Sequence, residues 1–275
     1  MSAAPWYERG VTLPDRAREI AETLNVYMPQ RPGTEVIDTP RYAAIVAPGE
    51  GPYLNVVQRL RLRPEEVAPV VAELRGRFAA AGCPGVTWEV GASATPGDLV
   101  ERLIGLGMVP EPREPLVTGM VLARPLPSPS TGVVARRVTT LDEFRIASAI
   151  LHRAFGGEGD EDPAAVDAAF LRHTAAPHLA RYLAWLGDAP VAAADALFVD
   201  AGVVMNGSAT LPEARGRGAY RALIAARWEE GARRGTPVLI TQAGAMSRPI
   251  LVRLGFEEVV EIRVLLDAPA SPPDP

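Results

Sequence analysis

The feature that most constrains this chain is a proline-rich segment near its middle. Pro125, Pro127 and Pro129 stand at alternate positions within it. Because proline lacks a backbone N–H and fixes φ, a regular helix or a central strand cannot pass through such a segment. A chain of 275 residues has room for two ordinary domains. We therefore predict a domain at 1–124, a linker at 125–132, a second domain at 133–267 and a flexible tail at 268–275.

The halves on either side of this linker repeat one order of elements. Each contains a helix, a strand, a second helix that ends at a Leu-Gly pair, and a last strand. Glycine stops a helix there because it readily adopts the left-handed conformation. We interpret the order as a duplicated α/β unit, although unrelated α/β segments can look alike at this level. The predicted ranges are 64–81, 86–90, a helix ending at Leu106-Gly107 and 115–122, then 218–234, 238–241, a helix ending at Leu254-Gly255 and 259–266.

Hydrophobic periodicity predicts three successive antiparallel strands in the second half. Breaks at 187–188 and 200–202 suit hairpin turns. Asn206-Gly207 interrupts the third strand and indicates a bulge or a close backbone approach. The predicted strands are 133–138, 181–186, 191–199 and 203–211, and the predicted helices are 141–155, 163–173 and 218–234. On the last helix the expected polar side carries Arg221, Glu229, Glu230 and Arg233.

The turn between strand 203–211 and helix 218–234 has the composition of an anion site. It reads Arg215-Gly216-Arg217-Gly218 and leads directly into the helix. A helix N-terminus presents free N–H groups and partial positive charge, and glycine lets an anion approach the backbone. A Walker loop requires a lysine, and the sequence has none. A dinucleotide fingerprint requires a third glycine where Arg221 stands. The turn therefore predicts a diphosphate site of another kind.

This stretch resembles the core motif of the GNAT acetyltransferases, Arg/Gln-x-x-Gly-x-Gly/Ala after the fourth strand. Arg215 and Gly218 match the motif, whereas Tyr220 replaces its last small residue. Leu254-Gly255-Phe256 resembles a second feature of that family. The resemblance covers about 133–266, and in the first half only the order of elements is shared. It implies an α/β (α+β) fold of two GNAT-like halves, each a mixed, mostly antiparallel sheet flanked by helices.

The resemblance implies an acetyl-CoA-dependent N-acetyltransferase that acts on a small amine by direct transfer. In this reading the first half is a degenerate copy that does not hold acetyl-CoA. The alternative is an acyl-CoA-binding pseudoenzyme with a sensing or scaffolding role, because Tyr220 and Leu251 differ from the residues that the family has at these positions. The residues expected at acetyl-CoA are Ala209, Thr210, Leu211, Arg215, Gly216, Arg217, Gly218, Ala219 and Tyr220.

The acid and base of the reaction are not fixed by sequence. In the family a tyrosine often protonates the leaving thiolate, and its position here is Leu251. Glu213 and Asp195 are candidates for the general base, and each has an alternative as an ordinary loop or strand carboxylate. The acidic loop 158–162 either caps the following helix or borders the acceptor pocket and attracts a cationic amine.

Composition excludes several other classes of protein. A net charge of −5 argues against an extended nucleic-acid surface. The single cysteine, Cys83, forms no internal disulfide, and no Cys/His cluster has metal-ligand spacing. No apolar stretch is long enough to span a membrane, and no secretory signal opens the chain. We expect a cytoplasmic protein without metal, nucleic-acid or membrane partners. The sequence predicts no oligomeric state.

Overall fold

The computed structural model describes residues 15–126, 132–157, 159 and 161–268. The chain forms two compact units. The C-terminal unit consists mainly of Val121–Thr241 with Arg253–Glu257. The N-terminal unit consists of Arg18–Met120, Gln242–Val252 and the chain from Glu258 onward. Most of the predicted linker and nearly all of the predicted tail lie outside the described residues.

The N-terminal unit is built on a mixed sheet with strand order β1-β2-β3-β4-β12-β6. Its neighbours pair antiparallel at β1–β2, β2–β3 and β4–β12, and parallel at β3–β4. The short strand β5 pairs with β12. The elements are α1 (Asp15–Glu22), η2 (Leu24–Tyr27), β1 (Glu35–Asp38), β2 (Ala43–Val46), η3 (Pro52–Leu54), β3 (Val56–Gln58), η4 (Pro64–Glu66), α2 (Val67–Ala80), β4 (Val86–Gly91), α3 (Leu99–Gly105), β5 (Val109–Pro110), β6 (Leu116–Leu122), α7 (Arg248–Arg253) and β12 (Glu257–Asp267).

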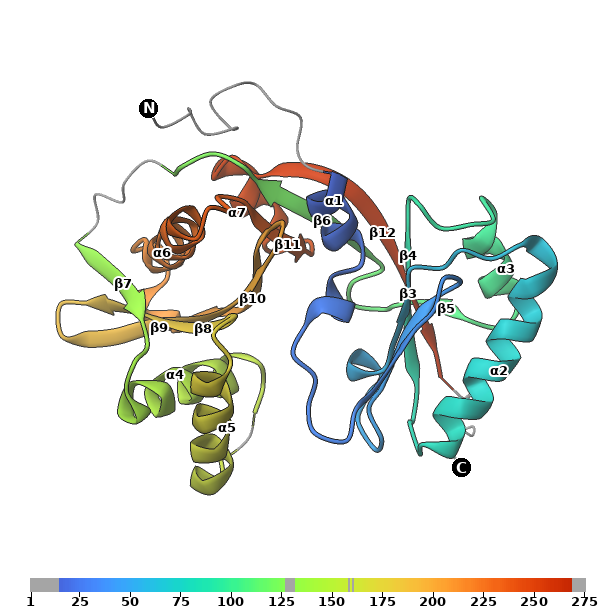
Figure 1. The fold of residues 1–275 in the computed structure, drawn as a ribbon, viewed down its shortest axis with the longest axis horizontal. Helices are drawn as coiled ribbons and strands as arrows, with labels where there is room; N and C mark the ends of the chain where they lie inside the picture. Colours follow the sequence, from blue (N-terminus) through green and yellow to red (C-terminus); the bar gives the residue numbers. More distant parts are fainter. Residues whose placement is uncertain (1–14, 127–131, 158, 160, 269–275) are drawn as a thin grey trace. The chain divides into compact units, whose positions relative to one another are not determined.

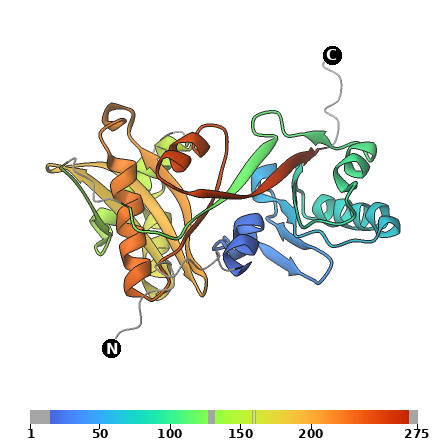
Figure 2. The ribbon, with the colours of Figure 1, turned by 90° about the horizontal axis from the view of Figure 1, so that it is seen from above.

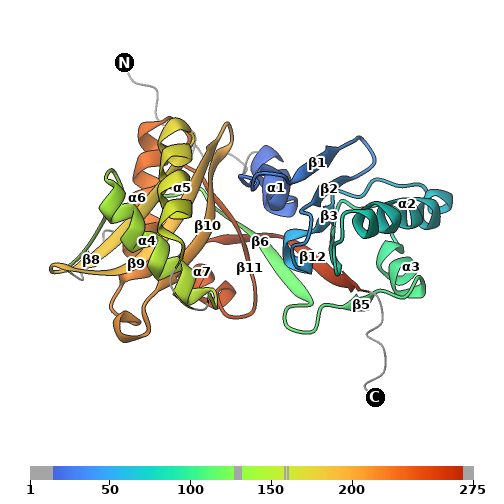
Figure 3. The same ribbon diagram turned by 90° about the horizontal axis from the view of Figure 1, so that it is seen from below.

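The core of this unit lies between the sheet and helices α2 and α3 (Figure 3). Every third or fourth residue of α2 is apolar and buried, as an amphipathic helix requires. Leu74 and Phe78 from α2 pack with Trp88 from β4. Leu103 from α3 completes the same cluster.

The last strand, β12, belongs to the N-terminal unit although it lies at the end of the chain. It pairs with β4 from Ile262↔Gly91 to Asp267↔Val86 and neighbours β6 in the sheet (Figure 2). Arg75 on α2 makes a bidentate ion pair with Asp267 at 2.8 to 3.2 Å. The predicted C-terminal domain 133–267 therefore contains a strand that groups with the first unit.

The C-terminal unit has strand order β7-β8-β9-β10-β11, antiparallel except for the parallel pair β10–β11. Helix α6 covers one face of this sheet, and α4 and α5 cover the other (Figure 1). Phe144 and Leu151 of α4 pack with Leu183 and Ala209 beneath them. The elements are β7 (Val133–Arg137), α4 (Leu141–Ala154), α5 (Pro163–Ala175), β8 (Leu179–Leu186), β9 (Ala189–Val199), β10 (Gly202–Thr210), η5 (Pro212–Ala214), α6 (Ala219–Arg233) and β11 (Leu239–Ala243).

The predicted fold class is confirmed, and the predicted elements of both halves are present with small shifts at their ends. One prediction about the polar side of α6 is wrong. Glu230 was expected on the polar side of α6, but it is 6% exposed and anchors a buried network. Its carboxylate accepts hydrogen bonds from Arg137 at 2.8 Å, from Arg234 at 2.6 Å and from the Tyr182 hydroxyl at 2.5 Å. The reason is that β7 and β8 pack over this side of the helix.

The described helices are all too short or too polar to cross a membrane.

Candidate functional site

The turn that follows β10 places two glycines in the left-handed region. After the short helix η5, Gly216 has φ +74° and Gly218 has φ +89°. Residues with a side chain rarely adopt such angles, so the two glycines are needed for the path of the backbone. Gly218 is also the N-cap of α6, and no side chain caps the helix there. The first N–H groups of α6 are therefore available to an external anion.

Two arginines add positive charge to this turn. Arg215 and Arg217 are both exposed. Neither has an ion-pair partner among the residues that the structure describes. Arginine donates bidentate hydrogen bonds to phosphate oxygens. The turn thus fits a diphosphate through its backbone conformation, its uncapped helix and its two arginines.

The strand that leads into the turn contains the predicted bulge. The pairing of β10 with β9 shifts register between Asn206 and Ser208, and Gly207 has φ +41°. On its other edge β10 pairs in parallel with β11 at Val203↔Leu239 and Val204↔Ile240, where the ladder ends. Strand β10 continues to Thr210. Its last residues therefore have an edge that β11 does not cover with ladder hydrogen bonds.

The direction of the backbone N–H groups along β10 follows from one hydrogen bond. Leu211 N–H donates to the Val191 carbonyl at 2.9 Å, on the side of β9. Because N–H directions alternate along a strand, Ala209 also faces β9, whereas Ser208 and Thr210 face the other edge. Of the predicted backbone donors, Leu211 is already engaged and Thr210 is the one directed to the uncovered edge. Sequence reasoning missed Ser208 as a backbone donor, because the direction of its N–H depends on the hydrogen-bonded register with β9, which the sequence does not give.

The two candidate bases lie in different surroundings. Glu213 is exposed within η5. Asp195 makes a bidentate ion pair with Arg181, with N–O distances of 2.7 and 2.9 Å. Arg181 also donates to the Ser148 hydroxyl at 2.6 Å and lies over the Phe144 ring. Since both oxygens of Asp195 accept strong hydrogen bonds, this carboxylate has a structural role that a free base would not have.

A fully buried arginine lies behind the bulge. Arg227 of α6 is 0% exposed and donates to the Leu223 and Asp195 carbonyls and to the Ser208 hydroxyl, at 3.1 to 3.2 Å. Its Nη2 has no hydrogen-bond partner among the described residues. Burial lowers the pKa of this guanidinium. The Ser208 hydroxyl is therefore engaged by Arg227.

Of the two substituted family positions, Leu251 is buried and Tyr220 is half-buried. Tyr220 follows the turn on α6, and burial raises the pKa of its hydroxyl above the ordinary value. Leu251 is 1% exposed in α7 and offers no proton to a leaving group. Both residues lie in the helices predicted for them, Tyr220 in α6 and Leu251 in α7.

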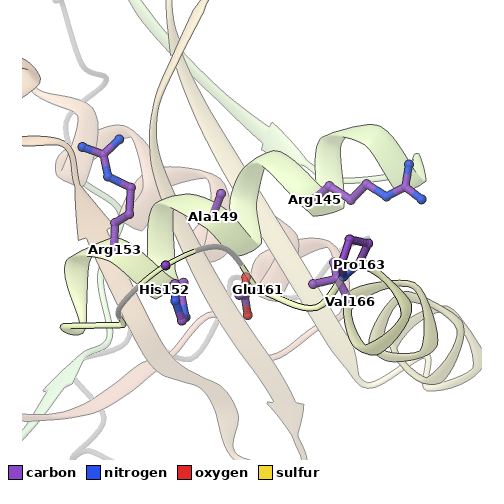
Figure 4. Close-up of a pocket in the computed structure, with 8 residues that line it drawn as sticks. Arg145, Ala149, His152, Arg153, Glu161, Pro163 and Val166 are labelled. Carbon is purple, nitrogen blue, oxygen red and sulfur yellow. The ribbon is translucent and has the colours of Figure 1, made fainter.

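A pocket of about 210 Å³ lies between α4, the start of α5 and the loop that joins them (Figure 4). Glu161 and His152 are among its lining residues. Asp162 caps α5 by accepting a hydrogen bond from Ala164 N–H at 3.0 Å, which confirms the capping alternative for one member of the acidic loop. Glu158 and Asp160 lie outside the described residues. The pocket is lined by Arg145, Ala149, His152, Arg153, Gly159, Glu161, Pro163 and Val166.

Solved structures that resemble this chain over most of its length are GNAT N-acetyltransferases, including a tandem GNAT protein, so the chain has the GNAT fold in a tandem arrangement. The chain is similar to a GCN5-related N-acetyltransferase from Kribbella flavida, at 20% identity and a TM-score of 0.64 over 91% of this chain and 95% of that one. A tandem GNAT protein from the clavulanic acid biosynthesis pathway matches at 16% identity and a TM-score of 0.62, over 92% and 89% of the two chains. A GCN5-related N-acetyltransferase from Sphaerobacter thermophilus matches at 17% identity and 0.61, over 96% and 92%.

No protein-family model matches the sequence, and no curated protein is similar to it in sequence.

Proposed function

We propose that the C-terminal half transfers the acetyl group of acetyl-CoA to a small amine. The observation that carries this proposal is the turn at Gly216 and Gly218, with two unpaired arginines and an uncapped helix. Within a GNAT fold, this turn is the feature suited to the diphosphate of CoA. Arg215, Arg217 and the first N–H groups of α6, from Ala219 and Tyr220, would hold the phosphate oxygens.

The uncovered edge of β10 supports the chemical step. The N–H of Thr210, and that of Ser208, are directed to donate to the thioester carbonyl and to stabilise the negative charge that develops on its oxygen. The amine nitrogen attacks the carbonyl carbon, the C–S bond breaks, and CoA leaves as a thiolate. The amine loses one proton to a base or to solvent, and the thiolate takes one up. Binding both reactants on one unit replaces a bimolecular encounter by a local one.

The geometry separates the two candidate bases. Glu213 is exposed and free to accept a proton, whereas Asp195 is held by Arg181. We therefore propose Glu213, directly or through water, ahead of Asp195. With Leu251 in place of the family tyrosine, thiolate departure depends on the acidity of the CoA thiol itself, with a pKa of roughly 8.5.

The alternative function is an acyl-CoA-binding pseudoenzyme. Two substituted positions motivate it: Leu251 supplies no acid, and Tyr220 occupies a position that is small in the family motif. The pseudoenzyme would bind acetyl-CoA and release no CoA with any acceptor. A panel of chemically diverse amines, with CoA release as the readout, separates the two functions.

A charge-reversal pair tests the site itself. Arg215→Glu together with Arg217→Glu replaces two phosphate donors by repelling carboxylates, while each side chain stays exposed. We expect acetyl-CoA affinity, measured by calorimetry, to fall by more than about 100-fold, since a charged hydrogen bond contributes about 1.5–3 kcal/mol. Arg172→Glu is the matched control, because Arg172 is an exposed arginine in the last turn of α5. Equal acetyl-CoA affinities of the double variant and the control would show that the turn does not bind acetyl-CoA.

A further inference from the structure

The N-terminal unit repeats the strand pair on which the proposed acetyl-CoA site is built. In both units two parallel strands are joined by a long helix, as β3-α2-β4 and as β10-α6-β11 (Figure 1). In both, the parallel ladder covers two residue pairs, which are Val56↔Thr87 and Val57↔Trp88 in the N-terminal unit. Gln58 and Glu89 are the next residues of β3 and β4. They lie just past the last pair of this ladder. The equivalent position in the other unit is the edge of β10 that β11 does not cover.

Gln58 is a buried amide without partners. Its side chain is 1% exposed, and neither its Nε2 nor its Oε1 has a hydrogen-bond partner among the described residues. A buried polar atom left unpaired costs about 1–3 kcal/mol. Side chains alternate along a strand, so Gln58 faces away from Val57, which packs into the core beneath α2. The Gln58 amide therefore points to the opposite face of the sheet, with one donor group and one acceptor to satisfy.

Glu89 lies on that same face and is half satisfied. Its Oε1 accepts a hydrogen bond from Asn25 Nδ2 at 2.7 Å, and Gln242 also hydrogen-bonds the carboxyl group. Its Oε2 is buried and has no partner among the described residues. Burial raises the pKa of Glu89 to about 7. No arginine is among the groups that act on this carboxyl group, so its ionised form has no cationic partner and burial favours the protonated form.

A second carboxylate approaches the same face two residues further along β4. Gly91 has no side chain, and the Glu22 carboxylate occupies the space where a Cβ would lie. Glu22 Oε1 accepts a hydrogen bond from Ser93 N–H at 2.9 Å. The face therefore combines two carboxylates with amide groups from Gln58, Asn25 and Gln242.

We propose that this face of β3 and β4 binds a small amine that also carries a hydroxyl or carbonyl oxygen. An ammonium group supplies hydrogen-bond donors to Glu89 Oε2 and Gln58 Oε1 and compensates the negative charge. The hydroxyl or carbonyl oxygen of the ligand accepts a hydrogen bond from Gln58 Nε2. The site differs from the acetyl-CoA turn, because no glycine follows β3 between Gln58 and α2. It does not depend on the proposed acetyl transfer.

Calorimetry and NMR on the full chain test this site. Ethanolamine and glycinamide are the probes, and ethylene glycol is the control ligand, of similar size but without an amine. We expect saturable binding of an amine probe and none of ethylene glycol. Ammonium binding favours the ionised carboxyl group, so the pKa of Glu89, followed by carboxyl ¹³C NMR, should fall on addition of the amine.

Variants locate the binding. Glu89→Gln keeps the shape of the side chain and removes the charge, and Gln58→Leu removes both amide atoms. Each should weaken binding by about 10-fold or more, the loss expected for one charged or buried hydrogen bond. Glu101→Gln, an exposed position on α3, should leave binding unchanged. If Gln58→Leu does not fold, Glu89→Gln decides alone. The proposal is overturned if neither amine binds, if Glu89→Gln binds as the wild type does, or if a crystal structure in saturating ethanolamine shows only water between Gln58 and Glu89.

Discussion

At the scale of single residues, burial decides which charged groups are available for chemistry. His173 of α5 is half-buried and lies 5.4 Å from the Phe144 ring, centroid to centroid. Burial lowers the pKa of His173 to about 4, although the Asp195 charge opposes the shift. His173 is therefore neutral near pH 7 and a weak base. Like Asp195, His173 is a polar residue near α4 with a structural role.

The lowered pKa of His173 predicts a pH dependence of stability. The unfolded chain binds this proton near pH 6.5 and the folded chain only near pH 4, so acid favours the unfolded state between these values. The free energy of unfolding should therefore decrease as the pH falls from 6.5 to 4. Because solvent screens the charge, we expect a change in the free energy of unfolding of about 1–2 kcal/mol. Urea denaturation across this range measures it. His173→Phe should flatten the pH profile, and His178→Gln, at an exposed position, is the control. A profile that His173→Phe leaves as steep as before would contradict the prediction.

The site residues were only partly predictable from sequence. The glycine turn has a local signal, because strand, glycines and helix follow one another in the chain. The pairing of Arg181 with Asp195 also has one, since the predicted turn at 187–188 lies midway between them and they are register partners across the hairpin. Gln58 and Glu89 have none. They are brought together by β3 and β4, which are separated by the whole of α2.

At the scale of elements, helix α6 shows how packing changes the meaning of a residue. Sequence periodicity gives its apolar side correctly, with Leu223 and Ile224 fully buried. It does not predict that Arg227 and Glu230 are buried too, because the strands that cover them come from distant parts of the chain. Gly231 is a similar case. A Cβ there would lie 2.7 Å from Val203 Cγ2 and 2.9 Å from the Thr236 carbonyl oxygen.

Two glycine-to-alanine substitutions in helices should therefore have opposite effects. Alanine is favoured over glycine in a helix by roughly 1 kcal/mol. Gly76→Ala in α2 meets no atom within 4 Å and should stabilise the protein by about that amount. Gly231→Ala forces α6 away from β10 and should destabilise it by about 1–3 kcal/mol. Chemical denaturation of both variants gives the two signs, and stabilisation by Gly231→Ala would contradict the observed packing.

At the scale of the whole molecule, the duplication was predictable from the sequence. The pairing of the last strand, β12, with the first unit was not. Both halves contain the same parallel pair with its connecting helix, as the repeated order of elements indicates. Strand β12 reads as the end of the second copy, yet its ladder partner β4 belongs to the first unit. A strand's pattern of apolar residues gives its type, whereas its neighbours depend on distant edges that no local signal describes. The halves also differ after the first strand of this pair, because only the second has a glycine turn there.

This divergence predicts one acetyl-CoA per chain. The segment between β3 and α2 contains arginines and a proline but no glycine, and its helix begins with the short turn η4 (Pro64–Glu66). The acidic Glu65 and Glu66 in that turn repel phosphate where the second half presents Arg215 and Arg217. Titration of the full chain with acetyl-CoA should therefore give a stoichiometry near one. The same titration of the Arg215→Glu, Arg217→Glu double variant should show no saturable binding left at concentrations that saturate the wild type. A stoichiometry of two, or binding that survives in the double variant, would mean that the first half holds acetyl-CoA by contacts other than a glycine turn.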